Sequence, residues 1–176
     1  HDVIRRQRQM CIRDRIFAIC WGLQVAVTVA GGQVKKSDKG AHRGIAHNIK
    51  VNNIGSNHKI YLNKKKQFNS PAFNFDEVVK IPEGAILLSS NELNNVMGLN
   101  FKTSTSDIWG IQYHPEITYE KMVSLIHFRK ERLLNKGAVQ GQDEINNHIL
   151  MSENEIKNTE KISRMKELEN WINYLY

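Results

Sequence analysis

The sequence predicts an α/β fold with an open central sheet and flanking helices. The chain has 176 residues, of which 40% are apolar and 24% charged, and this length and composition are those of one ordinary globular domain with its own core. Short apolar runs typical of buried strands occur together with longer segments of helical spacing. No apolar run approaches the ~20 residues that a membrane span needs, so we expect no membrane partner.

The first predicted elements lie within residues 16–32. Residues 16–19 form a short apolar run that suits a buried strand. Leu23, Val27 and Ala30 then recur at helical spacing, until two consecutive glycines end the pattern. This segment is therefore expected to be a strand, a tight turn and a helix.

The middle of the chain is rich in predicted strands. Apolar patterns bounded by turn residues predict them at 45–51, 59–62, 76–81, 85–89, 96–101 and 107–113. Two helices follow. Thr118 is a candidate N-cap for a helix over 119–134 that Gly137 closes, and a polar link over 140–147 leads to a final helix over about 153–175.

Positive charge is concentrated at the start of the chain. Five of the nine arginines lie in residues 1–15, and without that segment the net charge falls from +7 to +4. The mildly basic remainder predicts a solvated surface and no nucleic-acid partner. Cys11 and Cys20 are too few for a disulfide framework, and no signal-peptide cleavage pattern is present, which favours a cytoplasmic protein.

Residues 1–15 differ from the rest of the chain in more than charge. They contain no lysine and follow neither a strand nor a helix period, and the chain does not begin with methionine. Within them, the sequence MCIRDR resembles the translated read-through of a sequencing adapter. We therefore expect residues 1–15 to be non-native, and residues 16–176 to be the protein domain. The alternative is a basic N-terminal arm that binds nucleic acid.

Cys20 is the candidate nucleophile. It lies at the predicted strand-to-helix turn, with Ala18 and Gly22 on either side, and small neighbours are needed there because larger side chains would collide across the bend. The N-terminus of the following helix favours the thiolate, and the N–H of Trp21 is placed to face an oxyanion. The alternative is a buried structural cysteine.

His114 and Glu116 are the candidate base and its orienting acid. They follow the strand predicted at 107–113, and residues i and i+2 of an extended segment point to the same side. A carboxylate placed there can hold the imidazole by a hydrogen bond and fix its tautomer. His42 and His47 might suggest a metal pair, but no cysteine or carboxylate cluster accompanies them, and we expect no metal site.

Two motifs resemble the signatures of the class I (triad) glutamine amidotransferases. They are ICWGLQ at 19–24 and GIQYHPE at 110–116, in the family order and about ninety residues apart. Further segments, among them FNFDEV at 73–78 and LLSSN at 87–91, resemble the subgroup close to the amidotransferase domain of GMP synthase. The resemblance covers essentially all of residues 16–176, and it implies a flavodoxin-like form of the α/β fold.

The resemblance also implies a mechanism. Cys20 attacks the side-chain amide carbon of L-glutamine, His114 protonates the departing ammonia and then activates water, and Glu116 orients His114. Gln24 matches the motif position that helps to hold the substrate. The ammonia passes to an acceptor on a synthetase domain or subunit. No cofactor is implied.

Two features depart from the family pattern. Ala18 stands where the family usually has glycine, which is a mild change. Family members also carry more chain before the nucleophile strand. We therefore expect the first strands of the sheet, and a glycine-rich loop with the second oxyanion N–H, to be missing from the domain. Loss of one such donor typically lowers the rate about 10²–10³-fold, so the chain as given is expected to be inactive.

Two alternatives to an ammonia-supplying glutaminase stay open. A γ-glutamyl hydrolase or peptidase can use the same triad on a different donor. A catalytically silent binding or regulatory domain is the other alternative, and the intact set of Cys20, His114 and Glu116 argues against it for the parent protein.

Overall fold

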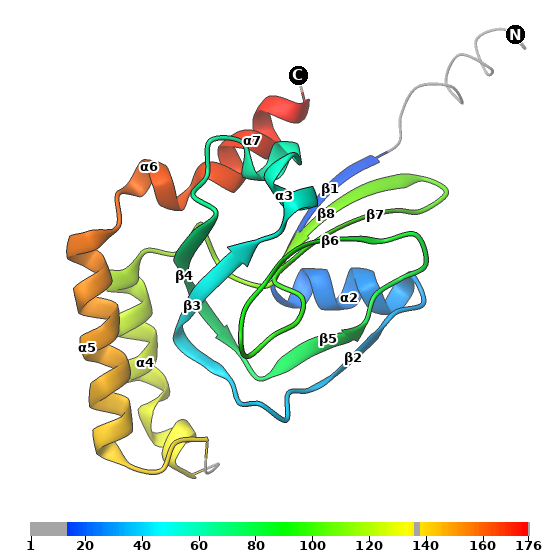
Figure 1. The fold of residues 1–176 in the computed structure, drawn as a ribbon. Helices are drawn as coiled ribbons and strands as arrows, with labels where there is room; N and C mark the ends of the chain where they lie inside the picture. Colours follow the sequence, from blue (N-terminus) through cyan, green and yellow to red (C-terminus); the bar gives the residue numbers. More distant parts are fainter. Residues whose placement is uncertain (1–13, 136–137, 176) are drawn as a thin grey trace, which may run out of the picture.

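The computed structural model describes residues 14–135 and 138–175 (Figure 1). Within these ranges the strands are β1 (Asp14–Ile19), β2 (Gln33–Lys36), β3 (His42–Val51), β4 (Gln67–Asn74), β5 (Asp76–Lys80), β6 (Ile86–Ser90), β7 (Gly98–Lys102) and β8 (Ser106–Ile111). The helices are α2 (Trp21–Val29), α3 (Asn53–Ser56), the 3₁₀ helix η1 (Lys59–Tyr61), α4 (Tyr119–Asn135), α5 (Gln142–Asn158), α6 (Lys161–Arg164) and α7 (Lys166–Leu175). None of these helices is long and apolar enough to cross a membrane.

The central sheet has six strands in the order β1-β8-β7-β6-β3-β4. β1 and β8 run parallel, with Ile16 opposite Ile108 and Ile19 opposite Ile111, and the remaining neighbours pair antiparallel. β2 and β5 form a separate antiparallel pair, and α2 lies between this pair and the central sheet (Figure 1). The predicted class, α/β with an open central sheet and flanking helices, is confirmed.

Alternate residues of β1 face two different cores, as the period of two requires. Ala18 belongs to the buried cluster that includes Leu23 and Val27 of α2. Phe17 packs against the cluster on the opposite face and stacks on Trp171 of α7, with 5.7 Å between the ring centroids. The strand that leads to Cys20 is thus held from both sides.

Gly110 of β8 lies directly against Leu23 of α2. A Cβ atom at this position would lie 2.3 Å from Cδ1 of Leu23, which is far inside van der Waals contact. A side chain there would force Leu23, which is completely buried, into another arrangement. The glycine therefore leaves room for a core side chain of the helix that follows the candidate nucleophile.

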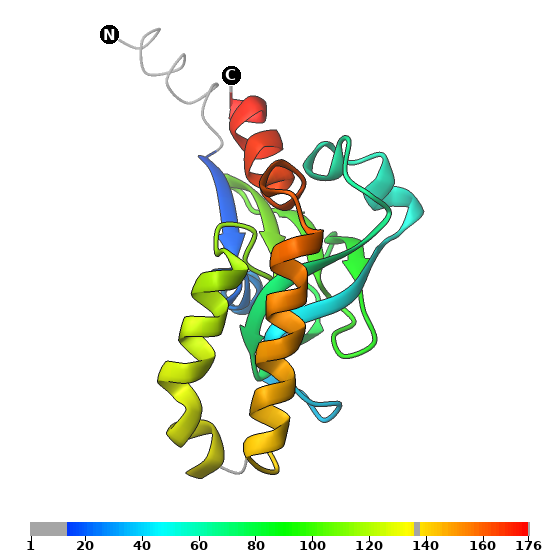
Figure 2. The same cartoon turned by 90° about the vertical axis from the view of Figure 1, so that its left-hand side faces the viewer.

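α4 and α5 form a helical pair that runs side by side along the molecule (Figure 2). Met122 and Ile126 of α4 and Ile145 of α5 are completely buried in the cluster between them. The polar link predicted over 140–147 is wrong, because most of it is the beginning of α5. Asp143 and Glu144 occupy the first turn of this helix, where acidic side chains complement the helix dipole.

The single final helix predicted over about 153–175 is also wrong, because three helices cover that segment. Thr159 (φ −114°, ψ 113°) and Glu160 (φ −69°, ψ 139°) are extended, which ends α5 and starts α6 in a new direction. α7 follows directly after Met165. The break brings Arg164 and Glu167 to the interior of the protein, where both are buried.

The strand predicted at 59–62 is wrong, because these residues form the short helix η1. Nδ1 of His58 accepts a hydrogen bond from the N–H of Ile60 (3.2 Å), and such side-chain caps compete with a strand ladder. Ile60 and Tyr61 are nevertheless buried in the core, which accounts for the apolar pattern.

Two observed strands lack a clear sequence pattern. β2 is a short polar strand, and β4 contains Pro71 and several polar side chains. Proline is tolerated in β4 because this strand is the last in the order of the sheet, where one side of the ladder is free. The carbonyl of Pro71 instead accepts a hydrogen bond from the N–H of His114 (2.7 Å).

Three predictions concern residues at the ends of the described ranges or outside them. Residues 1–13, which make up most of the segment expected to be non-native, lie outside them. β1 begins at Asp14, two residues before the predicted strand, and Nη1 of Arg15 donates to the carbonyl oxygen of Tyr174 (2.6 Å). Gly137, the predicted close of the helix at 119–134, is likewise not described, and α4 ends at Asn135.

Candidate active site

Cys20 occupies a sharp turn between β1 and α2. Its backbone has φ 52° and ψ −108°, in the half of conformational space that favours glycine, and such strain is typical of a nucleophile at a strand-to-helix turn. The N–H of Cys20 donates to the carbonyl of Ile111 (2.7 Å), so the end of β8 fixes the turn. The side chain is buried, at 8% exposure. Ala18 is buried beside the bend, but a Cβ atom at Gly22 would meet nothing within 4 Å, so the expected collision of a larger side chain at that position is wrong.

His114 and Glu116 lie together just beyond the end of β8. Nδ1 of His114 is 2.6 Å from Oε1 of Glu116, so the carboxylate holds the imidazole through that nitrogen. The backbone N–H of His114 is bound to β4, which fixes the position of the ring from a second direction. The Nε2 atom is thereby left for a different contact.

Cys20 also influences this imidazole. Burial lowers the pKa of His114, but interactions with Cys20 and with Glu116 outweigh it and raise the pKa to about 9. The protonated form of the ring is therefore favoured at neutral pH. The fold thus brings His114 into direct contact with Glu116 and within electrostatic reach of Cys20.

Gln24 connects this group to a neighbouring strand. Its Nε2 donates to the carbonyl oxygen of Asp76 (3.1 Å) and to Oε1 of Gln112 (3.3 Å). Nε2 of Gln112 in turn lies 3.5 Å from Sγ of Cys20. Gln112 is completely buried and is a site residue that the sequence did not predict. One signal for it exists, since Gln112 precedes His114 by two residues and so shares its side of the segment.

Trp21 is the first residue of α2, where a backbone N–H has no partner four residues earlier in the helix. Its side chain is 74% exposed, so only its main chain faces the buried part of the turn. A role for this N–H in holding an oxyanion stays a prediction. The same holds for the second N–H that the family resemblance assigns to chain upstream of residue 16.

Arg164 holds the loop that carries His114 and Glu116. Its buried guanidinium donates through Nη1 to the carbonyl oxygens of Pro115 and of Ile117, the latter at 2.9 Å. The loop is thereby bound on both sides of Glu116 by a residue of α6. The sequence did not predict this contact, because its partners are nearly fifty positions apart in the chain.

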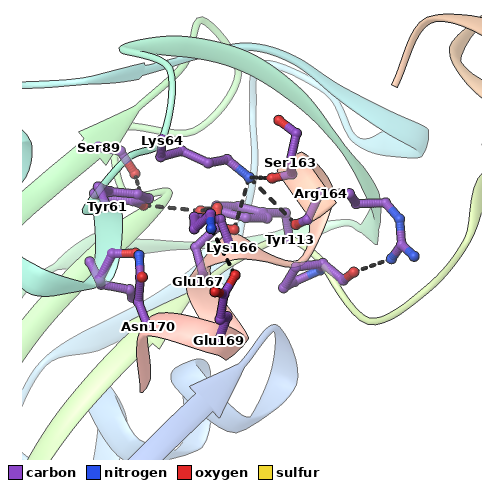
Figure 3. Close-up of polar contacts among 12 residues, drawn as sticks. Tyr61, Lys64, Ser89, Tyr113, Ser163, Arg164, Lys166, Glu167, Glu169 and Asn170 are labelled. Atoms are coloured by element: carbon purple, nitrogen blue, oxygen red, sulfur yellow. Dashed lines mark hydrogen bonds and ion pairs between the residues drawn. The ribbon is translucent and has the colours of Figure 1, made fainter. Parts of the chain in front are cut away.

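Glu167 of α7 holds the residue before His114 in a second buried network (Figure 3). The hydroxyl of Tyr113 donates to Oε1 of Glu167 (2.7 Å), and Nζ of Lys64 lies 2.8 Å from Oε2. The side chains of Lys64 and Glu167 are 3% and 0% exposed. Burial and the Glu167 charge raise the pKa of Tyr113, so that it stays a neutral donor.

His42 is fully engaged inside the protein. Nδ1 is bound to Oδ1 of Asn74 (2.9 Å) and Nε2 to the amide of Asn91 (2.9 Å). Burial lowers the pKa of His42 to about 4, so the ring is neutral. Within residues 14–135 and 138–175, no group of three or more His, Cys, Asp or Glu side chains has the arrangement to hold a metal ion.

The sequence and the fold are similar to those of known proteins. The family model described as glutamine amidotransferase class-I matches residues 3–131. A γ-glutamyl-L-1-hydroxyisopropylamide hydrolase from Pseudomonas sp. is 30% identical over 128 residues, which are 71% of this chain and 43% of the relative. A glutamine-hydrolysing GMP synthase subunit from Methanococcus vannielii is 29% identical over 111 residues, which are 63% of this chain and 55% of the relative.

The fold is also shared with a solved structure. A glutamine amidotransferase from Thermotoga maritima superposes with a TM-score of 0.67 at 18% identity, over 99% of this chain and 66% of that one. The chain spans about half the length of the curated relatives that it matches. Because the family model matches well over half of its residues, the chain belongs to the class-I glutamine amidotransferase family.

Proposed function

We propose that this domain hydrolyses the side-chain amide of L-glutamine through a thioester on Cys20 and supplies the ammonia to an acceptor. The carrying observation is that Cys20 occupies a strained turn while Nδ1 of His114 is held by Glu116 at 2.6 Å, and it is supported by the influence of both residues on His114, whose pKa they raise to about 9. The acceptor site would belong to a synthetase domain or subunit, which the similarity to the GMP synthase of Methanococcus vannielii supports. We place the reaction in the cytoplasm.

The roles of the residues follow from their contacts. The Cys20 thiolate forms a bond to the amide carbon, and the N–H of Trp21 stabilises the oxygen that becomes negative. His114 gives its proton to the nitrogen as the C–N bond breaks, and ammonia leaves. His114 then takes a proton from water, which attacks the thioester and releases glutamate. Glu116 keeps the imidazole in the correct orientation, and Gln24 helps to hold the substrate.

A second candidate is hydrolysis of γ-glutamyl amides or peptides by the same three residues. The 30% identity to a γ-glutamyl amide hydrolase favours it. The chemistry is the same, because each donor passes through the same γ-glutamyl thioester. Only the departing amine differs between the two candidates.

Acyl-enzyme formation tests the proposal. Incubation of the full-length parent protein with L-glutamine, a γ-glutamyl amine or a γ-glutamyl peptide, followed by acid quench and peptide mass spectrometry, is expected to find a γ-glutamyl group on Cys20. Competition among the three donors separates the two candidates. If none of them labels Cys20, the domain is a silent binding module.

The pH dependence of kcat/KM should reflect the protonation state of His114. Because its pKa is raised to about 9, the proton that ammonia needs is present at neutral pH and is lost as the pH rises through about 9. We expect an alkaline limb there, and a Glu116→Gln variant should move that limb toward 6.5, the ordinary value for histidine. A Glu120→Gln variant, which removes an exposed carboxylate of the neighbouring helix α4, should leave it in place. A limb that does not move in Glu116→Gln would contradict the pairing.

A further inference from the structure

The side-chain amide of Gln112 lies beside the candidate nucleophile, and the proposed reaction gives it no role. Gln112 directly follows β8 and is completely buried. Its Nε2 lies 3.5 Å from Sγ of Cys20, and its Oε1 accepts a hydrogen bond from Nε2 of Gln24 (3.3 Å). Each end of this buried amide therefore has a partner, as buried polar groups require.

The contacts of Gln24 determine which end of the Gln112 amide faces the sulfur. An amide nitrogen donates and an amide oxygen accepts, so the surrounding hydrogen bonds decide the orientation of each amide. The carbonyl oxygen of Asp76 can only accept, and the nitrogen of Gln24 therefore faces it at 3.1 Å. The same nitrogen lies against Gln112, which thus presents its oxygen to Gln24 and its N–H to Cys20.

The acceptor that sets this orientation has a fixed position. Asp76 is the first residue of β5, and its carbonyl oxygen also accepts a hydrogen bond from Nδ2 of Asn74 (3.0 Å). A reversed Gln112 amide would place nitrogen against nitrogen at Gln24 and an oxygen lone pair against a thiolate at Cys20. Both contacts would be repulsive, and the burial of Gln112 keeps water from relieving them.

The main chain holds the sulfur and the amide in one register. The N–H of Cys20 donates to the carbonyl of Ile111 (2.7 Å), the residue before Gln112. The N–H of Gln112 donates to the carbonyl of Met97 (3.0 Å), just before β7. The approach of the amide to the sulfur is therefore set by the sheet as well as by side-chain contacts.

We propose that the side-chain N–H of Gln112 donates a hydrogen bond to the Cys20 sulfur and favours the thiolate, and that Gln24 keeps this donor in place. Hydrogen bonds to a charged acceptor are roughly twice as strong as those between neutral groups, so the donor stabilises the thiolate more than the thiol. Gln112 touches a reacting atom and is a catalytic residue, whereas Gln24 acts through it as a positioning residue. Both N–H bonds of the Gln24 amide are engaged in this way, which leaves its oxygen for the substrate.

This inference rests on the acyl transfer at Cys20 proposed above and adds a donor to it. The sulfur is negative before it attacks, loses that charge in the thioester and regains it when water releases glutamate. A donor at the sulfur raises the fraction of protein that is ready to attack. It also makes the sulfur a better leaving group in the second step.

Alkylation of Cys20 tests the donor without requiring turnover. The full-length parent protein and its Gln112→Met variant are treated with iodoacetamide over a range of pH, and peptide mass spectrometry follows the modification of Cys20 alone. Methionine is close to glutamine in length but cannot donate a hydrogen bond. The alkylation rate follows the thiolate fraction. We expect the pH of half-maximal rate to rise by about one unit in the variant, which is the effect of losing a hydrogen bond to a charged group.

A Gln24→Met variant tests the positioning role, and it tests the donor as well if Gln112→Met does not fold. This variant keeps the Gln112 amide but removes the N–H that binds its oxygen, so the amide is free to turn away from the sulfur. We expect the half-maximal pH to rise here too, by less than in Gln112→Met. Melting temperatures check that each variant folds.

The matched control is an Asn100→Leu variant. Asn100 is another buried amide of the central sheet, on β7, but it donates to Oδ1 of Asp107 (2.9 Å) and to the carbonyl oxygen of Ile108 (3.0 Å). Its loss should lower the melting temperature and leave the half-maximal pH for Cys20 unchanged. An equal shift in this variant would mean a general loosening of the core and would overturn the inference.

An unchanged half-maximal pH in either folded Gln112→Met or folded Gln24→Met also overturns it. A change in the maximal rate alone counts against the donor, because a loosened turn alters access to the sulfur at every pH. These outcomes are separate from those of the proposed function. If no γ-glutamyl donor labels Cys20, the alkylation profile still reports the hydrogen bond, and if Cys20 is acylated but the profile does not shift, only the role of Gln112 is refuted.

Discussion

Replacing Cys20 by alanine in the full-length parent protein is expected to abolish hydrolysis of every γ-glutamyl donor, with a fall in kcat on the order of 10⁴- to 10⁶-fold. The reason is that no other nucleophile is available at the turn, and residues that act as one unit lose nearly all of their effect when one member is removed. Alanine keeps the strained backbone of the turn and removes only the sulfur. Ammonia or free amino acid released from the donor is the readout.

Because Cys20 and His114 act in the same step, the effects on kcat of replacing each of them should not add. A His114→Ala variant should lose activity to a similar extent, and the double variant should be no worse than either single one. Wild-type and Cys20→Ala protein should melt at nearly the same temperature, which would show that the loss of activity does not come from unfolding. Equal product release by both proteins would refute the assignment of the nucleophile.

Replacing Glu167 by glutamine is expected to give the largest loss of stability, about 3–5 kcal/mol in the free energy of unfolding. Glutamine has almost the same shape and can still accept from Tyr113, but it leaves the ammonium of Lys64 buried without a counter-charge. Burial already lowers the pKa of Lys64 against the pull of Glu167. Urea denaturation at neutral pH measures the change.

The matched control lies on the same helix (Figure 3). Glu169 pairs with Lys166 at 2.8 Å, as close as Glu167 pairs with Lys64, but its side chain is 52% exposed. A Glu169→Gln variant should therefore cost no more than about 1 kcal/mol. If the two substitutions lower the free energy of unfolding equally, burial does not increase the stabilising effect of the Lys64–Glu167 pair.

The features that could be predicted from sequence are local ones. The turn at Cys20 could be predicted from an apolar strand and a helical pattern within some fifteen residues, although the structure does not require a small residue at position 22. His114 and Glu116 were predicted to lie together, but on the wrong geometry: Pro115 and Glu116 are the centre of a turn closed by the hydrogen bond from the N–H of Ile117 to the carbonyl of His114 (3.2 Å), and are not extended. Strands β6, β7 and β8 each contain apolar residues between turn residues, so their existence could be predicted, with boundaries that differ by a few residues.

The features that could not be predicted depend on distant partners. β4 is polar and contains a proline, and it is a strand because β3 and the N–H of His114 bind it. The apolar stripe over 153–175 is real, but helical spacing cannot reveal that Thr159 and Glu160 are extended. Gln112 could have been suspected from its position beside His114. Arg164 could not, because only the folded chain brings α6 to the carbonyl of Pro115.

The hold of Arg164 on the loop also determines when the site is completed as the protein is made. Synthesis runs from the N-terminus, so Cys20, His114 and Glu116 are all part of the chain before Arg164 and Glu167 are added. Until α6 and α7 dock, the carbonyls of Pro115 and Ile117 lack the guanidinium that holds them. A nascent chain thus contains Cys20, His114 and Glu116 before it has the contacts that align them. Those contacts form when α6 and α7 dock.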